Sequence, residues 1–286
     1  MLDKINVIVW GTPLLVLLLG TGLLFTVRLR AFQFKDFSYI LKSTFFSLFQ
    51  KDEENRNGTS QLRAVSTSLA AAMGTGNIVG VATAISIGGA GAIFWMWVSA
   101  FLGMALVYAE NYLATLFRSS DKGGAMAYLE YGTGRRFPAV LFAACCALAA
   151  FGMGNMTQSN AISSALFVSL DIPPLWTGLA VALICGLVII GGAKRIGSVT
   201  GIMIPCLAIL YFGAALFVIF SNISEVPDVF ADIFGSAFGL RQAGGGISGA
   251  VIGRAINVGL RRGVFSNEAG KRGWQDLRFS YYSSAR

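Results

Sequence analysis

Residues 70–80 read Ala-Ala-Ala-Met-Gly-Thr-Gly-Asn-Ile-Val-Gly, a polar motif broken by glycine within an apolar stretch. That stretch, Ala64–Ile87, is long enough to cross a bilayer. Lipid supplies no hydrogen-bond partner for a broken helix backbone or for the Asn77 amide, so such a break is tolerated where it lines a polar cavity. Transporter helices use breaks of this kind to hold substrates and ions. The motif therefore predicts a membrane transporter.

The composition of the whole chain points the same way. Hydrophobic residues make up 55% and charged residues 13%, whereas a soluble domain has about 25% charged residues. We predict an all-α polytopic membrane protein without a soluble domain. A seventh, more polar segment starts near Gly245, and the six candidate spans are Val7–Val27, Ala64–Ile87, Ala92–Leu116, Phe137–Val168, Leu175–Gly191 and Ile196–Phe220.

The basic residues predict how these spans are oriented. Seven lie in residues 28–63, four in 117–136 and two in 192–195, whereas the connections on the other side hold only Lys4 and Arg241. Cytoplasmic loops of membrane proteins carry the excess of Lys and Arg, so the N-terminus is predicted to be outside. Because the net charge of +8 is spread between apolar runs, we expect no nucleic-acid partner.

Several kinds of chemistry are excluded or disfavoured by the residues present. The chain has no His, which removes imidazole general bases and His-based metal sites. Its four Cys residues lie in apolar runs without CxxC spacing and are predicted to be small packing residues: Cys145, Cys146, Cys185 and Cys206. No nucleophile–base set or metal cluster is evident, so we expect neither an enzyme nor a cofactor. A channel subunit would need a polar stripe along a pore, and the sequence has isolated motifs instead.

Thr75, Gly76 and Asn77 are the first candidate site residues. Flanking glycines free the backbone to leave helical geometry, and broken helix ends direct N–H groups toward carboxylates and carbonyls toward cations. The alternative is tight helix packing, because Gly76 and Gly80 have small-xxx-small spacing. Packing alone would need neither the Thr nor the Asn.

A second polar cluster surrounds Gln158 and contains Asn155, Thr157, Ser159 and Asn160. Its span, Phe137–Val168, is too long for one straight crossing, so we expect tilt or a local break. Gln158 can both donate and accept hydrogen bonds, which suits a zwitterionic ligand. Interhelical hydrogen bonding is the alternative role.

Glu110 is the lone carboxylate within a complete span. It is a candidate ion ligand or proton carrier, or else it extends to the interface or pairs with an Arg. Two other segments are predicted at the membrane surfaces. Phe32–Phe49 is aromatic and mildly basic, which suits a cytoplasmic interfacial helix or a plain connector, and residues 223–240 are expected on the outer surface.

Four ordered motifs resemble the alanine/glycine:cation symporter family. They are Gly74–Ile78, Gly123–Leu129 (where the family usually has Pro at the position of Ala125), Gly154–Asn160 and Arg262–Gly270, which reads Arg-Gly-Val-Phe-Ser-Asn-Glu-Ala-Gly. The resemblance implies a sodium-driven carrier of alanine or glycine that works by alternating access, with a leucine-transporter-type inverted-repeat fold. It also implies a multi-pass protein of a prokaryotic inner membrane, with lipid as its surroundings.

The resemblance also assigns the site residues. The broken helices of the family line the substrate and sodium sites, so Thr75, Gly76, Asn77, Gln158, Ser266 and Asn267 become the expected contacts. Glu110, Asn155 and Glu268 are further ion-binding or structural candidates. Sodium enters as the transported coupling ion rather than as a cofactor.

The chain departs from the family pattern after Gly270, where residues 271–286 are basic and aromatic. We therefore expect the first inverted half to be complete and the second to be largely missing. The predicted parts are 1–63 (first span and interfacial segment), 64–221 (five spans of the first repeat), 222–270 (outer segment and start of a seventh, broken helix) and 271–286 (a tail foreign to the family). The alternative to a working symporter is an inactive remnant, or a half-transporter that needs another chain or self-association.

Overall fold

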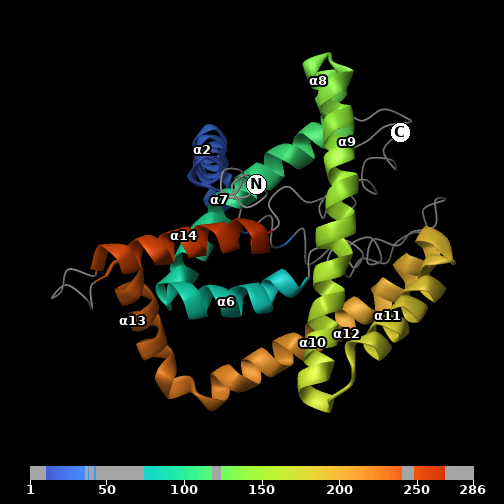
Figure 1. Cartoon of the computed structure of the whole chain (residues 1–286). Helices are drawn as coiled ribbons and strands as arrows, with labels where there is room; N and C mark the ends of the chain where they lie inside the picture. Colours follow the sequence, from blue (N-terminus) through green and yellow to red (C-terminus); the bar gives the residue numbers. More distant parts are fainter. Residues whose placement is uncertain are drawn as a thin grey trace. The chain divides into compact units, whose positions relative to one another are not determined.

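The computed structural model describes residues 11–35, 38, 42, 74–117, 124–239 and 248–267. Every regular element in those residues is helical, as predicted, and Figure 1 shows their arrangement along the chain. The chain divides into two compact units. The first unit contains α2, α3, α6, α13, α14, most of α7 and the second part of α12, and the second unit contains α8–α11 with the first part of α12.

In the described part of the chain, three helical stretches are long and apolar enough to cross a membrane: Gly91–Leu116, Arg136–Leu170 and Arg195–Ser221. Three shorter apolar helices cover Pro13–Arg28, Thr75–Gly88 and Pro174–Ile190. Large apolar side chains are widely exposed on these helices; Val168 and Ile190 are more than four-fifths exposed. Exposed apolar surface on this scale fits helices that face lipid. The helices thus have the composition and surface of a membrane protein.

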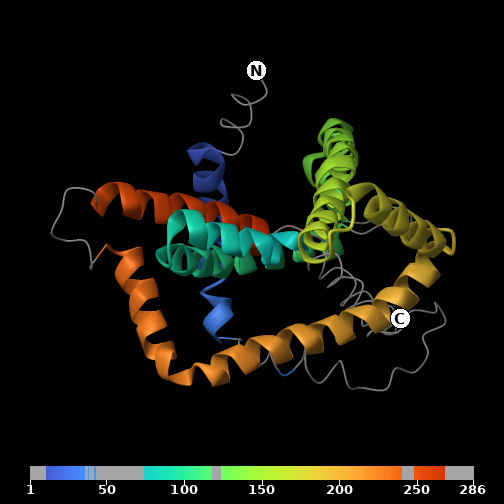
Figure 2. The ribbon, with the colours of Figure 1, turned by 60° about the horizontal axis from the view of Figure 1, so that its bottom comes forward.

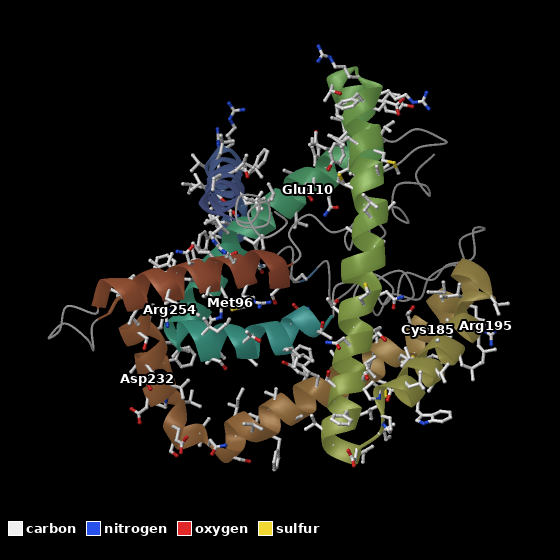
Figure 3. All side chains as sticks on the ribbon, viewed as in Figure 1. Met96, Glu110, Cys185, Arg195, Asp232 and Arg254 are labelled. Atoms are coloured by element: carbon white, nitrogen blue, oxygen red, sulfur yellow. The ribbon has the colours of Figure 1, made fainter. Side chains whose placement is uncertain are left out.

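Three helices form the centre of the first unit: α6 (Val79–Gly88), α7 (Gly91–Leu116) and α14 (Ser248–Asn267). α14 lies alongside α6, as Figures 1 and 2 show. It also approaches α7 closely, because a Cβ atom added at Gly259 or Gly263 would lie 2.5–2.9 Å from atoms of Ala92, Met96 and Ser99. Small residues therefore let α14 pack directly on the α7 backbone. Met96 is labelled in Figure 3 beside α14.

The helix α13 (Val226–Ala237) docks on the first turns of α7 through aromatic rings. Phe94 contacts Phe234 and Phe238 with ring centroids 5.6 and 5.0 Å apart, and the Trp95 indole donates a hydrogen bond to the Ala237 carbonyl at 3.4 Å. The sequence predicted an outer surface segment here but not this aromatic attachment. Since ring packing depends on which helices meet, hydropathy along one chain does not reveal it.

At the other end of the first unit, α2 (Thr12–Arg28) and the short α3 (Phe32–Lys35) form a corner against α7. Buried Gln33 donates to the Thr26 hydroxyl at 3.0 Å, and Phe32 stacks 4.6 Å from Tyr108. α3 covers only the start of the predicted interfacial helix Phe32–Phe49. Within that segment, residues 36–37, 39–41 and 43–49 lie outside the described residues.

The second unit is built from consecutive antiparallel neighbours. α8 (Gly124–Thr133) packs on α9 (Arg136–Phe151), and α10 (Thr157–Leu170) packs on α11 (Pro174–Ile189) after a turn with Asp171 in the left-handed conformation. α12 (Gly192–Ser221) follows and contains Pro205. Between α9 and α10 lies a π-helical segment, Gly152–Met156, so the expected irregularity is observed within one continuous helical stretch, Arg136–Leu170, rather than as a break.

The four cysteines correct one prediction. All four thiols are free and exposed on α9, α11 and α12 rather than packed inside, and Cys185 is labelled in Figure 3. A thiol is apolar enough to face lipid, so an apolar run alone does not show whether its cysteines point inward.

Candidate transport site

The glycine-rich motif adopts a 3₁₀ turn rather than continuing as an α-helix. This turn, η1, covers Thr75–Asn77, and α6 begins at Val79 after an uncapped Ile78. Such 3₁₀ turns are frequent at the N-termini of α-helices, and η1 leads into α6 in this way. The first part of the predicted span Ala64–Ile87, residues 64–73, lies outside the described residues, so a break in the middle of that span stays a prediction.

Within the second unit, Thr75 is joined to Gln158. The Thr75 hydroxyl donates to Gln158 Oε1 at 2.8 Å, and the Thr157 hydroxyl donates to the same oxygen at 3.1 Å. A Cβ atom added at Gly74 would lie 3.2 Å from Gln158 Nε2. The glycine thus lets the amide approach the backbone at the start of η1, so two separate sequence motifs meet at this amide.

Within the first unit, Asn77 is joined to Ser266. The Ser266 hydroxyl donates to Asn77 Oδ1 at 2.6 Å, across 189 positions of sequence. Both side chains come from motifs that were predicted to line the site. The turn η1 therefore carries polar contacts to the Gln158 motif through Thr75 and to the Ser266 motif through Asn77.

The other predicted residues have more varied surroundings. Asn155 lies in the π-helical segment and is exposed, and π-bulges are frequent at functional sites. Asn267 ends α14, and only its backbone is described. Glu268 lies outside the described residues.

Glu110 lies near the C-terminal end of α7, as labelled in Figure 3, and is half-buried. The Glu110 carboxylate acts electrostatically on Tyr128 in α8. Burial, and then the Glu110 carboxylate, raise the pKa of the Tyr128 phenol above its ordinary value. Glu110 thus belongs to the surroundings of α8 rather than to the contacts made by η1.

Two residues beside η1 and α14 were not singled out from the sequence. Half-buried Arg262 lies one helical turn before Ser266, and its Nη1 would be 3.7 Å from a Cβ atom at Gly80. Ser99 in α7 is 2% exposed, and its hydroxyl has no hydrogen-bond partner among the described residues. Arg262 begins the motif Arg262–Gly270 and stands four residues before Ser266, and this helical spacing is the sequence signal that could have pointed to it.

Comparison with known proteins adds the family. The model of the sodium:alanine symporter family matches residues 1–273. The chain belongs to this family. It is a family of symporters rather than of enzymes, which fits the broken apolar helices described above.

Individual relatives agree with the family match. The sodium/alanine symporter AgcS of Methanococcus maripaludis is 45% identical over 94% of this chain, and an uncharacterised transporter of Haemophilus influenzae is 46% identical over 94%. The Bacillus subtilis protein named probable sodium/glutamine symporter GlnT is 40% identical over 93%. The chain spans 60%, 59% and 55% of the lengths of these three relatives.

Proposed function

We propose that this chain carries the substrate and sodium site of a sodium-coupled symporter for alanine or glycine. The hydrogen bond between Asn77 and Ser266 is the observation that carries the proposal, because it joins the two broken-helix motifs within one unit. The names of AgcS and the family support sodium and alanine as the transported pair. The name of GlnT shows that side-chain size of the substrate varies among relatives.

The polar groups at η1 suit both cargoes. Sodium is a hard cation that binds oxygen, and unwound backbone carbonyls beside hydroxyl and amide oxygens supply such ligands in transporters. Thr75, Asn77 and Ser266 each bring a side-chain oxygen. Gln158 can accept from the substrate ammonium group and donate to its carboxylate. We assign these four residues, with Gly76 and Asn267, to the site.

The proposed cycle is alternating access in a prokaryotic inner membrane. Sodium and the amino acid bind together at the broken helices, and one part of the protein then moves against the other to change the side that is open. The 3₁₀ turn η1 supports this cycle, since its backbone differs from the regular α-helix of α6 that follows it and so offers a point at which the chain can bend. The leucine-transporter-type fold remains part of this proposal.

Uptake by purified protein in liposomes tests the function. We expect saturable accumulation of labelled alanine and glycine under an inward sodium gradient, and none when choline replaces sodium. Equal uptake in empty liposomes, together with no sodium-dependent alanine binding, would refute the proposal. Sodium-dependent binding without uptake would favour the alternative in which another chain completes the transporter.

A further inference from the structure

The same face of α14 packs against α6 from Val258 to Ser266. Val258 lies against Gly88: a Cβ atom added at Gly88 would be 3.3 Å from the Cβ atom of Val258. Arg262 lies against Gly80, and Ser266 contacts Asn77 just before α6. The three α14 residues are four positions apart, which places them on one face of the helix. Their partners occur in the opposite order along the chain, so α14 and α6 are antiparallel, and Arg262 lies in the interface between them.

The Arg262 guanidinium lies beside Gly80 of α6. Gly80 is buried, and Nη1 of Arg262 would be in ordinary contact, at 3.7 Å, with a Cβ atom added there. The guanidinium therefore lies over the first turn of α6, one turn of α14 away from the hydrogen bond between Ser266 and Asn77. A strong positive charge is thus positioned beside two of the proposed site residues.

This charge lacks a carboxylate partner in the described part of the chain. No ion pair or hydrogen bond joins Arg262 to another described residue. The first turn of α6 contains no acidic residue and has no side-chain cap, so the positive end of the α6 dipole adds to the positive potential there. A half-buried guanidinium within an apolar helix bundle is costly unless an anion compensates it.

We infer that Arg262 binds the carboxylate of the transported amino acid and sets the preference for substrates that carry one. This inference rests on the proposed function and adds a residue to it. A guanidinium pairs with a carboxylate through two parallel hydrogen bonds, which gives both charge and orientation. Arg262 from α14, with the first turn of α6, supplies the anion-binding side of the site, and the side-chain oxygens of Asn77 and Ser266 in the same unit are left for the ammonium group and sodium.

A comparison of alanine with alaninamide tests the assignment, because the amide keeps the ammonium group and methyl side chain but loses the negative charge. The full chain is titrated with each ligand in sodium buffer, and binding is followed by calorimetry. We expect the wild type to bind alanine at least tenfold more tightly than alaninamide. In R262Q, alanine affinity should fall at least tenfold while alaninamide affinity changes less than threefold.

Arg261 provides the matched control, since it is the exposed neighbour of Arg262 on α14. R261Q should keep the wild-type preference for alanine. R262K keeps the charge but loses the paired geometry, so its preference should be intermediate; it also answers the question if R262Q does not fold.

An unchanged alanine-to-alaninamide ratio in both R262Q and R262K would overturn the assignment while leaving sodium-dependent alanine binding intact. An equal loss of preference in R261Q would also overturn it, because the effect would then be a general one of surface charge. Replacing chloride by gluconate should leave wild-type alanine affinity unchanged. A requirement for chloride would show that a free anion occupies the Arg262 position.

Discussion

Thr75 and Gln158 are joined by a hydrogen bond, although 83 positions separate them in the chain. Each stood out in the sequence because a polar side chain in an apolar segment needs a partner. Their pairing was not predictable, since it depends on which helices meet. The same holds for Asn77 and Ser266. Arg262 was overlooked because its motif was interpreted through its Ser-Asn-Glu portion.

Replacing Thr75 tests the pair directly. Thr75→Val keeps the shape of the side chain but removes the hydroxyl that donates to Gln158. A lost hydrogen bond with a partly buried partner costs about 1–3 kcal/mol, so sodium-dependent alanine affinity should fall roughly 5- to 100-fold. Thr75→Ser should retain most of the affinity. Equal affinities for Thr75→Val and wild type would show that the pair is structural only.

Asn77 gives a second prediction at this scale. Asn77→Ala removes the oxygen that accepts from Ser266 and that is proposed to face sodium. Sodium-dependent uptake should be abolished, whereas the amount of folded protein in the membrane should remain close to wild type. The two are measured on the same preparation by transport and by fluorescence-detected gel filtration. Retained uptake would remove Asn77 from the site.

Among the elements, α14 depends most on small residues. Gly263 leaves no room for a side chain, because a Cβ atom there would lie 2.8–2.9 Å from Ser99 and Met96. Gly263→Val should therefore force α14 away from α7 and cost about 1–3 kcal/mol. The measurement is the thermal unfolding midpoint in detergent, which should fall by several degrees.

Gly253 is the control on the same helix, since a Cβ atom there meets nothing within 4 Å. Gly253→Ala should leave the midpoint unchanged or raise it slightly, because Ala favours the helix by up to about 1 kcal/mol over Gly. A similar loss of stability in both variants would mean that contact with α7 does not explain the effect of the Gly263 substitution.

Element boundaries show what periodicity and composition can predict. Where both ends of an apolar run are described, the run located the helix to within a few residues: Ala92–Leu116 was predicted and Gly91–Leu116 is observed. The irregular geometry at η1 and in the π-helical segment was expected because glycines and polar side chains cluster there. The docking of α13 on α7 was not expected, since it rests on aromatic contacts between separate segments.

For the whole molecule, the distribution of basic residues predicts the topology. Residues 28–63 and 117–136 should face the cytoplasm, with the N-terminus and Ser221 outside. Single cysteines introduced at Gly58 and Ser221 in a cysteine-free background would be labelled with an impermeant maleimide in intact cells. Labelling is expected at Ser221 and protection at Gly58. The reverse pattern would invert the proposed orientation.

The central claim is that the polar groups around η1 bind sodium and an amino acid together. Its most direct test is calorimetric titration of the purified chain with alanine at several sodium concentrations, and with sodium at several alanine concentrations. Binding linkage requires each ligand to raise the affinity for the other by the same factor. We predict reciprocal factors of at least tenfold that disappear in Asn77→Ala. Alanine binding that is independent of sodium, or no specific binding of either ligand, would contradict the account.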